Sequence, residues 1–463
     1  MHNPLQRFHA RSSLLVAAWV LWFAVPVALS QARARAQDHE LLVLVSIDGL
    51  KPEAILEAES RGLKVPNLRA LLTDGTYATG VRGVLPTVTY PSHMTLLTGA
   101  SPARHGILSN TTFDPLNRNA KGWYWYAEDG RAETLWDAAA AAHLTTASVY
   151  WPTSVGANIS YNLPQIWRTG TIDDLKLQRA LSTPGLDQDL SAALGVYPGG
   201  KEESVAADEI RARFDVRLLE TRHPDFATFY FTGLDTEQHD SGPFSAAANA
   251  ALERLDTLVG QLRLAAEHQA PGRTTLCVVS DHGFAAVAHD VNLYAAFVNA
   301  GLFTMDDKRR ITSWKAMPWP AGGSAAIMLA DPRDSIARAQ VSTLLTQLAN
   351  DPDSGIERIL SHDEIAARGG FPGAEFLVAF RVGYEFGDAY DGPVVSKPSN
   401  LGTHGYLPEH PEMRSSFFIV GPHIAAGHSL GEIDMRRIAP TLAGILHVHL
   451  KDAELEPLRL DAR

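Results

Sequence analysis

Residues 41–48 of this chain read LLVLVSID, and they point to its fold class. Leu41 to Ile47 form a short and almost wholly apolar run, which is typical of a strand covered on both faces. Such strands belong to parallel sheets with helices packed on either side. The run ends at Asp48, which lies at the carboxyl end of the predicted strand. Open α/β sheets bind their ligands outside that end.

The same pattern recurs along the chain. Three further apolar runs indicate strands, at residues 226–232, 274–280 and 416–420. Amphipathic stretches of helical length accompany these runs, at residues 133–143, 203–220, 245–267 and 434–446. This alternation of strands and helices predicts an α/β fold with a mainly parallel central sheet.

Two stretches depart from the alternation. Residues 110–167 are rich in Trp, Tyr, Asn and Pro, a composition that suits loops forming the wall of a pocket. Residues 287–402 separate two polar motifs and contain strand and helix patterns of their own. We therefore expect one domain at residues 37–463, with an insertion or small subdomain at residues 287–402.

The composition sets limits on function. The chain has 463 residues, of which 45% are hydrophobic and 20% charged, as in a globular protein with an ample core. Its formal net charge of −12 argues against binding of a nucleic-acid polymer, which needs a basic face to neutralise phosphates. A small phosphate ester is still allowed, because a bound metal can supply positive charge locally.

The N-terminal segment has the pattern of an export signal. Arg7 and Arg11 precede an apolar stretch at residues 14–29, and residues 34–36 (ARA) offer a cleavage site. We predict a signal peptide at residues 1–36 and an exported protein, periplasmic or secreted. An uncleaved anchor is the alternative, although the stretch is short for a membrane span. No later stretch is apolar for long enough to span a bilayer, so we expect no span after leader removal.

Cys277 is the only cysteine in the sequence, which excludes an intramolecular disulfide. It lies in the apolar run 274–280, where a buried structural thiol is expected rather than a nucleophile. An exported protein without disulfides depends on its core, on bound metal or on both.

Polar residues follow three of the predicted strands. Asp48 directly follows the first strand, Asp235 comes three residues after the run at 226–232, and Asp281-His282 directly follow the run at 274–280. Because parallel strands end at the same edge of a sheet, we expect these side chains to lie close together.

These residue types suit a zinc site, since zinc accepts Asp oxygen and His nitrogen. Asp235 and His239 have i, i+4 spacing, which places both side chains on one face of a helical turn. Gly283, next to the Asp-His pair, permits a tight turn. His404 lies in the glycine-flanked loop GTHGY, which can approach a metal closely.

Each candidate ligand also has an ordinary structural explanation. Asp48 could cap a helix, and a lone loop histidine such as His404 is usually exposed and without function. Six residues in order, three of them at strand ends, favour a shared metal site over separate caps. The six are Asp48, Asp235, His239, Asp281, His282 and His404.

Residues 85–93 (LPTVTYPSH) offer hydroxyl groups just before a predicted helix. A hydroxyl is a weak nucleophile unless it is activated. Two metal ions suit phosphoryl transfer, because one can activate the nucleophile while the other stabilises the leaving oxygen. Phosphate is also favoured at a helix N-terminus. Thr87 is our candidate nucleophile, whereas for Thr89 we favour the alternative that its side chain caps the helix.

Five motifs are spread over most of the chain. They are VSIDGL (45–50), PTVTYPSHMTLLTGASPARHGILSN (86–110), Asp235-x-x-x-His239 followed by Gly242-Pro243, DHGF (281–284) and GTHGYLPEHPEMRSSFFIVGP (402–422). Together they resemble the nucleotide pyrophosphatase/phosphodiesterase family of the alkaline phosphatase superfamily, in its bacterial form with a catalytic domain alone. The resemblance implies an alkaline-phosphatase-like α/β/α sandwich, in agreement with the strand pattern.

The resemblance also implies roles for individual residues and two Zn²⁺ ions per chain. Thr87 matches the family's nucleophile, which bridges toward the second zinc and forms a phospho-threonine intermediate. Asn110 matches the asparagine that donates a hydrogen bond to a phosphate oxygen. The implied ligands are Asp235, His239 and His404 for one ion, and Asp48, Asp281 and His282 for the other.

Three positions depart from the family pattern. Gln238 stands where the family often has glycine, Val88 stands where lysine or an aromatic residue is frequent, and Phe284 stands where methionine is common. None of the three is an implied ligand. Because they surround the pocket, they leave the substrate preference open.

We expect a metal-dependent hydrolase that cleaves phosphodiester or pyrophosphate bonds of nucleotides or related small phosphate esters. The aromatic residues 123–126, or Tyr161, would contact a nucleotide base, with ordinary packing as an equally good explanation. One alternative is a phosphomonoesterase or phosphonoacetate-type hydrolase, for which Arg168 and Lys121 are possible cations. A metal-stabilised binding protein without turnover is less favoured, because Thr87 and all six ligands are present.

Overall fold

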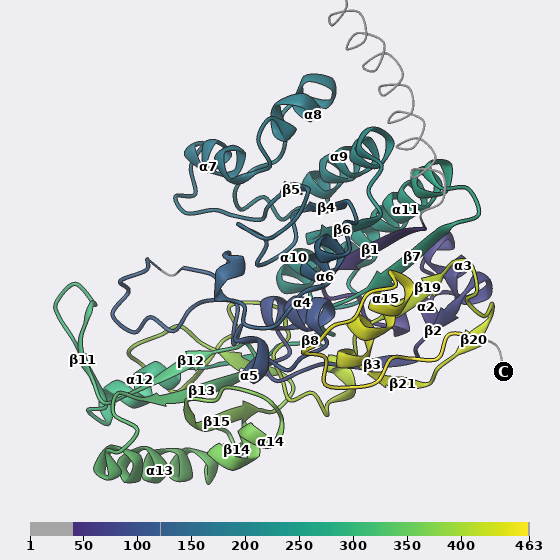
Figure 1. Ribbon diagram of the computed structural model, residues 1–463. Helices are drawn as coiled ribbons and strands as arrows, with labels where there is room; N and C mark the ends of the chain where they lie inside the picture. Colours follow the sequence, from purple (N-terminus) through teal and green to yellow (C-terminus); the bar gives the residue numbers. More distant parts are fainter. Residues whose placement is uncertain (1–39, 121, 462–463) are drawn as a thin grey trace, which may run out of the picture. The chain divides into compact units, whose positions relative to one another are not determined.

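The computed structural model describes residues 40–120 and 122–461, so the signal peptide predicted at residues 1–36 lies outside the described residues. A central sheet of eight strands forms within this part of the chain (Figure 1). In spatial order the strands are β20 (His428–Ser429), β2 (Thr76–Tyr77), β19 (Phe417–Val420), β7 (Thr274–Val279), β1 (Leu41–Ile47), β6 (Phe226–Phe231), β4 (Thr146–Val149) and β5 (Tyr161–Leu163).

Five neighbouring strands, from β7 through β1, β6 and β4 to β5, pair in parallel. The prediction of a mainly parallel sheet is therefore confirmed. The strand expected at residues 416–420 forms as β19, but it pairs antiparallel with both β7 and β2. An apolar run indicates that a strand is buried on both faces, and it carries no information about the strand's direction.

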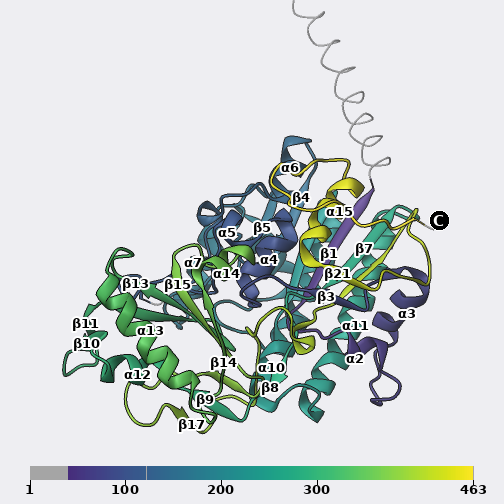
Figure 2. The ribbon, with the colours of Figure 1, turned by 90° about the horizontal axis from the view of Figure 1, so that it is seen from below.

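Helices cover both faces of the central sheet, as the predicted sandwich requires (Figure 2). One layer contains α3 (Pro66–Asp74), α9 (Val205–Arg222) and α11 (Ala246–Gln269). The other contains α4 (Thr89–Thr98), α6 (Leu135–Ala141) and α15 (Ile438–Ile445). Shorter elements are α2 (Glu53–Leu56), α5 (Pro102–His105), α7 (Asp173–Leu181), α8 (Leu186–Leu194), β3 (Gly80–Arg82) and β21 (Glu432–Asp434).

Side-chain caps fix where three helices begin. The hydroxyl groups of Thr134, Ser204 and Ser245 accept main-chain N–H groups at the starts of α6, α9 and α11. These helices were expected at residues 133–143, 203–220 and 245–267, and each begins one or two residues later than predicted. The helix expected at 434–446 opens with a 3-10 turn, η3 (Met435–Arg437), before α15.

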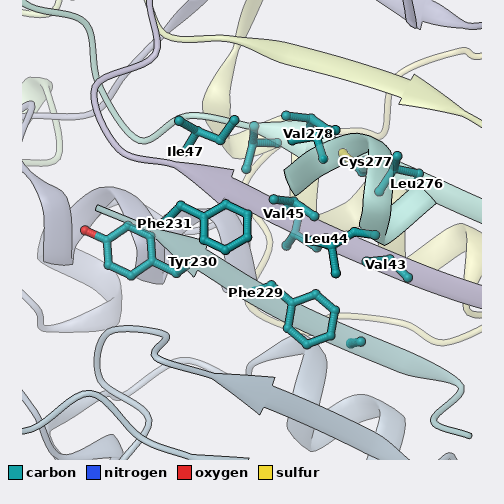
Figure 3. Close-up of a cluster of buried hydrophobic side chains, with 14 of the residues drawn as sticks. Val43, Leu44, Val45, Ile47, Phe229, Tyr230, Phe231, Leu276, Cys277 and Val278 are labelled. Carbon is teal, nitrogen blue, oxygen red and sulfur yellow. The ribbon is translucent and has the colours of Figure 1, made fainter. Parts of the chain in front are cut away.

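The strand β1 is buried along its whole length in the main hydrophobic core. Figure 3 shows its aliphatic side chains between the aromatic residues of β6 and the aliphatic residues of β7. In register, Val45 lies opposite Phe229 of β6 and Val278 of β7. Cys277 of β7 is fully buried and burial raises the pKa of its thiol, so the prediction of a structural cysteine is confirmed.

Residues 110–167 hold more regular structure than the loops expected there. The strands β4 and β5 of the central sheet come from this stretch, in addition to α6. Their sequences are TASV and YNL. Because polar residues interrupt both, the apolar pattern that identified the other strands is absent here.

The segment at residues 287–402 has a sheet and a hydrophobic cluster of its own. The sheet is antiparallel, in the order β12 (Ala316–Pro320), β13 (Ser324–Leu329), β15 (Ala374–Phe380) and β14 (Ile356–Ser361). Helices α12 (Leu293–Asn299), α13 (Ser335–Ala349) and α14 (His362–Ala367) accompany it. At its ends, β8 (Ala285–Ala286) pairs with β18 (Gly402–Thr403). The chain therefore leaves and re-enters the main fold at one place, while the boundaries 287 and 402 stay a prediction.

Smaller strands complete this segment, namely β9 (His289–Val291), β10 (Phe303–Met305), β11 (Ile311–Trp314), β16 (Tyr384–Phe386) and β17 (Val395–Ser396). Among the described residues, every helix is too short or too polar to cross a bilayer.

Candidate metal centre and active site

Asp48 and the pair Asp281-His282 lie just beyond the carboxyl ends of the neighbouring strands β1 and β7. All three side chains are buried. His282 Nε2 lies 3.3 Å from Asp48 Oδ1 and 3.2 Å from Asp281 Oδ2. Each residue offers a ligand atom within 4.8 Å of the others, so the three can hold one metal ion.

The helix α10 (Gly233–Ser241) follows β6 and carries Asp235 and His239 one turn apart. His239 Nε2 lies 3.5 Å from Asp235 Oδ2, and His404 Nε2 lies 3.8 Å from Asp235 Oδ1. The ring of His404 also stacks on that of His282, with 3.7 Å between ring centroids. Asp235, His282 and His404 form a second group with ligand atoms within 4.8 Å. The structure thus brings all six candidate ligands into one cluster.

Three carboxylate oxygens of this cluster are buried without a hydrogen-bond partner among the described residues: Asp48 Oδ1, Asp235 Oδ1 and Asp281 Oδ2. Burial raises the pKa of Asp235 to about 7. Burial, together with the nearby Asp235, raises the pKa of Asp281 to about 7. Burial and both neighbouring carboxylates also raise the pKa of Asp48 well above its usual value. Uncompensated buried carboxylates are costly, and a divalent cation would remove that cost, so these residues fit a metal centre.

The three candidate histidine ligands keep their Nε2 atoms available for a metal. Each Nδ1 lies within hydrogen-bond distance of a main-chain carbonyl: His239 at 2.9 Å from Gly402 O, His282 at 3.1 Å from Gly283 O and His404 at 3.2 Å from Thr87 O. Since a carbonyl only accepts, Nδ1 carries the proton and Nε2 keeps its lone pair. Burial lowers the pKa of all three imidazoles, to about 3 for His404, which favours the neutral form that binds metal.

The raised carboxyl pKa values predict a pH-dependent gain from Asp281→Asn in the metal-free protein. An unfolded aspartate has a pKa near 3.9, whereas the pKa of folded Asp281 is about 7. Protonated Asp281 is the form that suits the folded state. Its contribution to the free energy of unfolding is therefore fully present below about pH 4 and is lost as the pH rises to about 7. Asparagine keeps the acceptor for the Gly49 N–H and does not ionise.

In EDTA, we therefore expect the Asp281→Asn variant to melt on the order of 5 °C above the wild type at pH 8, a gain that shrinks below about 2 °C at pH 4.5. Thermal unfolding followed by tryptophan fluorescence measures the difference. With zinc added, the order reverses, because the variant loses a ligand. A gain that does not change with pH would contradict the assigned carboxyl pKa.

Thr87 lies two residues before α4 and is fully buried beside this cluster. Its Oγ1 donates a hydrogen bond to the Tyr406 carbonyl at 2.7 Å. Its own carbonyl is the partner of His404 Nδ1. A direct hydrogen bond therefore joins Thr87, the candidate nucleophile, to His404, a candidate ligand.

The prediction that Thr89 caps α4 is wrong. The N-cap residue is Val88, in extended conformation, and its side chain makes no capping hydrogen bond. Thr89 Oγ1 instead lies 3.4 Å from His282 Nε2, because the first turn of α4 faces the ligand cluster. The positive end of the dipole of α4 therefore lies at the ligand cluster, where it favours an anion.

Asn110 sits beside the same helix start. Its Oδ1 accepts a hydrogen bond from the Tyr90 N–H at 2.9 Å. This contact fixes the orientation of the amide and leaves Nδ2 as a donor, the atom that the predicted phosphate contact requires. The position of Asn110 is thereby defined, while its contact with phosphate stays a prediction.

Comparison with known proteins agrees with this geometry. The family model for type I phosphodiesterase / nucleotide pyrophosphatase matches residues 42–407, which contain Thr87, Asn110 and all six candidate ligands. The chain belongs to this family. Its predicted membership of the alkaline phosphatase superfamily is thereby confirmed.

Curated relatives of this family member match part of its length. A venom phosphodiesterase of Naja atra is 27% identical over 261 residues, which cover 54% of this chain and 27% of the relative. Human ectonucleotide pyrophosphatase/phosphodiesterase family member 1 is 27% identical over 250 residues, which cover 52% of this chain and 23% of the relative. The chain thus spans about a quarter of the length of these relatives.

A solved structure shows the fold of the family. Murine ectonucleotide pyrophosphatase / phosphodiesterase 5, an inactive variant in complex with AMP, is 18% identical to this chain. The match has a TM-score of 0.64 and covers 90% of this chain and 97% of the murine one. The predicted alkaline-phosphatase-like fold is confirmed by this likeness.

Gly283 of the family motif DHGF has a different role from the tight turn expected. Its backbone does not adopt the left-handed conformation that favours glycine. A Cβ at this position would lie 2.1 Å from the Glu412 carbonyl oxygen and 2.7 Å from that of Arg414. Glycine is required here because two main-chain segments approach closely.

Sequence reasoning missed the residues that support the ligands in this family member. The Tyr230 hydroxyl donates to Asp48 Oδ2. His93 packs edge-on against the Tyr230 ring, and its Nδ1 lies 2.8 Å from the Thr89 carbonyl and 3.6 Å from Asp281 Oδ2. Tyr230 stands inside the apolar run of β6, where only the register with β1 shows that its hydroxyl reaches Asp48.

The residues that depart from the family pattern lie at the site, as expected. Gln238 is buried and its Nε2 donates to the Gly49 carbonyl at 3.0 Å, which links α10 to the loop after β1. The buried ring of Phe284 lies 4.9 Å from that of His239 and 5.6 Å from that of His404. Both departures therefore support candidate ligands by packing or hydrogen bonding.

The aromatic residues proposed to contact a base differ in their surroundings. Trp125 is buried in a small hydrophobic cluster with Trp167, and Tyr161 lies half-buried on the edge strand β5 with the Arg222 guanidinium over its ring. The structure favours packing for these two. Trp123 is half-buried and packs against the same cluster, with its ring 5.0 Å from that of Trp167 and 5.3 Å from that of Tyr90, on the helix that Thr87 precedes. A base contact by Trp123 stays a prediction.

A cavity of about 600 Å³ lies between the loop that follows Asn110 and the segment 287–402. Residues 111–117 form one wall, and Trp319, Tyr294 and Tyr390 contribute aromatic side chains to the others. The strand β12 lines the cavity and then leads to Gly323, whose N–H donates to the His404 carbonyl at 2.7 Å. The lining of the cavity begins at Thr111, directly after Asn110, and includes neither Thr87 nor a candidate ligand.

Proposed function

We propose that this family member hydrolyses phosphodiester or pyrophosphate bonds of nucleotides or related small phosphate esters. The observation that carries the proposal is the convergence of six ligand side chains, three of them with unpartnered buried oxygens, beside Thr87. Relatives named phosphodiesterase and nucleotide pyrophosphatase support it, as does the AMP bound to the murine structure. On the strength of its leader sequence, the protein would act outside the cytoplasm, in the periplasm or after secretion.

Two zinc ions are the proposed cofactors, since carboxylate oxygen and imidazole nitrogen are donors that zinc accepts. When bound, they supply positive charge that favours ionisation of the Thr87 hydroxyl and stabilises the charge that develops on phosphate oxygens. The residues that would hold them are Asp235, His239 and His404 for one ion, and Asp48, Asp281 and His282 for the other.

Thr87 is the proposed nucleophile. Its Oγ bonds to phosphorus as the bond from phosphorus to the leaving oxygen breaks, and the proton that Thr87 gives up balances the one that the leaving group takes up. Water then attacks the phospho-threonine, the bond from Thr87 Oγ to phosphorus breaks, and Thr87 regains a proton. The inactive murine relative carries alanine in place of a threonine, which supports a threonine in this role.

Asn110 and the start of α4 are proposed to bind the phosphate. The fixed amide of Asn110 would donate from Nδ2 to an oxygen that does not take part in bond breaking. The N-terminus of α4 adds a favourable dipole for the same anion. Both groups orient the phosphorus toward Thr87.

Two observations favour a diester over a monoester. A diester has a second group that needs space, and the aromatic-walled cavity whose lining begins at Thr111, the residue after Asn110, would accommodate it. A monoester carries an additional negative charge, for which Arg168 was a candidate partner. The Arg168 side chain is exposed, its guanidinium lies 5.1 Å from the Trp125 ring, and its Nη2 donates to the Asn119 carbonyl at 3.4 Å, so the contacts it makes are with neither Thr87 nor a candidate ligand. Lys121, the other candidate, lies outside the described residues.

Steady-state hydrolysis of bis(p-nitrophenyl) phosphate, p-nitrophenyl phosphate and phosphonoacetate tests the proposed function. We expect the zinc-loaded protein to show a kcat/KM at least about tenfold higher for the diester than for the other two, and EDTA to abolish it. A preference for the monoester or the phosphonate would overturn the diester assignment. Bound zinc without hydrolysis of any substrate would favour the binding protein instead.

A further inference from the structure

The helix that carries Asp235 and His239 is capped by a residue of another helix. Asp208 of α9 is fully buried, and its Oδ2 accepts hydrogen bonds from the N–H groups of Thr232 at 3.0 Å and Gly233 at 2.7 Å. These two residues begin α10, and the side chain of its own N-cap residue, Thr232, makes no capping hydrogen bond and instead accepts one from Arg211 Nη1 at 3.4 Å. Asp208 therefore satisfies main-chain donors that a helix start would otherwise leave unpaired.

Arg211 holds Asp208 in this position. Its Nη1 donates to Asp208 Oδ1 at 2.8 Å, and its Nη2 donates to the Glu202 carbonyl. The guanidinium lies 3.5 Å from the centroid of the Tyr150 ring. Both carboxylate oxygens of Asp208 are thus engaged, one by Arg211 and the other by the start of α10. Asp208 cannot move without breaking one of these contacts.

The two helix starts are also packed closely together. A Cβ at Gly233 would lie 2.5 Å from the main-chain nitrogen of Val205, the first residue of α9. Asp235 comes two residues after Gly233, and His239 follows one turn later. A displacement of the start of α10 would therefore move both side chains relative to His404, which comes from a different part of the chain.

A buried ion pair is a weak contributor to net stability, because the desolvation of two charges offsets their attraction. The ion pair of Asp208 and Arg211 can instead serve to fix the position of α10, whose first N–H groups Asp208 binds. We propose that Asp208, held by Arg211, is a positioning residue that sets the metal half-site formed by Asp235 and His239. This inference rests on the proposed function, in that it assumes zinc at the cluster.

The chain contains a matched control for this arrangement. Asp256 of α11 is buried, and it accepts hydrogen bonds from the N–H groups of Asn67 at 3.2 Å and Leu68 at 2.7 Å. These residues begin α3, which carries none of the candidate ligands. Asp208→Asn and Asp256→Asn therefore remove the same kind of buried carboxylate cap, one beside the ligand cluster and one away from it.

Zinc binding by the full-length wild type and the two variants tests the proposal, by titration against a fluorescent chelator together with thermal unfolding of the same samples. We expect Asp208→Asn to weaken one of the two zinc sites by about 10- to 100-fold and to leave the other within about twofold. Asp256→Asn should lower the melting temperature by a similar amount and keep both zinc affinities. Unchanged zinc affinity in Asp208→Asn, or an equal loss in Asp256→Asn, would overturn the positioning role.

A second variant covers the case in which Asp208→Asn does not fold. Arg211→Lys keeps the charge and loses the two-pronged hold on Asp208 and Glu202, so we expect one zinc site to weaken by about three- to tenfold. Zinc affinities within twofold of the wild type would overturn the inference. A wild type that binds no zinc would refute the proposed function itself, whereas normal zinc binding in every variant refutes only the role of Asp208.

Discussion

Thr87→Ala is expected to lower the turnover number for a phosphodiester by on the order of 10³- to 10⁵-fold while both zinc ions stay bound. Alanine removes the atom that would bond to phosphorus. The ligand cluster is preserved, because the contact between Thr87 and His404 runs through the main-chain carbonyl of Thr87. Hydrolysis of bis(p-nitrophenyl) phosphate and the zinc content of the same sample measure both quantities.

Two neighbouring variants make this result specific. Thr87→Ser keeps a hydroxyl at the same place and should restore part of the turnover. Thr89→Ala removes the hydroxyl that lies 3.4 Å from His282 Nε2 and should cost less than about tenfold. Near-normal turnover of the Thr87→Ala protein would contradict the covalent mechanism. A greater loss in Thr89→Ala than in Thr87→Ala would assign the nucleophile to Thr89.

The central strands could be predicted because burial on both faces leaves few polar residues in them. β1, β6 and β7 each read as an apolar run, and the positions of their ends in the sequence predict that Asp48, Asp235 and Asp281 lie at one edge of the sheet. The strands β4 and β5 were missed because Thr146, Ser148 and Asn162 interrupt them. All three polar side chains are buried in the folded protein. A hydrophobic pattern cannot predict this, because it assigns polar residues to the surface.

The candidate ligands were recognisable from residue type and spacing, whereas the groups that orient them were not. The Gly402 and Thr87 carbonyls that fix His239 and His404 are main-chain atoms from distant parts of the chain. Nothing in the residue types at those positions identifies them as partners. The same holds for Tyr230 and Asp208, whose roles depend on the register between strands and on the packing of two helix starts.

The wrong assignment of Thr89 and the different role of Gly283 have a common cause. Local rules assign a hydroxyl before a helix to a cap and a glycine after a strand to a turn. In this fold both positions face a neighbouring segment instead. Thr89 faces His282, and Gly283 lies against the main chain at Glu412 and Arg414. Tertiary contacts at the ligand cluster decide both cases, and local sequence does not report them.

His282→Ala is expected to reduce the zinc content from two ions toward one and to lower diester turnover by at least about 10³-fold. His282 belongs to both groups of ligand atoms within the cluster. Its Nε2 lies 3.2 Å from Asp281 Oδ2, and its ring stacks on His404 at 3.7 Å. Alanine therefore removes a ligand from one half-site and a packing partner from the other, while Asp48 Oδ1 and Asp281 Oδ2 stay buried without a hydrogen-bond partner in the described part of the chain.

Metal analysis and kinetics on one preparation distinguish the two variants, because His282→Ala should lose both zinc and turnover whereas Thr87→Ala should lose turnover alone. His362→Ala serves as the control. His362 Nδ1 is bonded to the Ala374 carbonyl within the segment 287–402, so its removal should change neither zinc content nor turnover. Two zinc ions and more than about a tenth of wild-type turnover in His282→Ala would show that this histidine is not a ligand. Zinc loss without loss of turnover would separate the reaction from the metal centre, and the chemistry proposed for Thr87 would then need another source of activation.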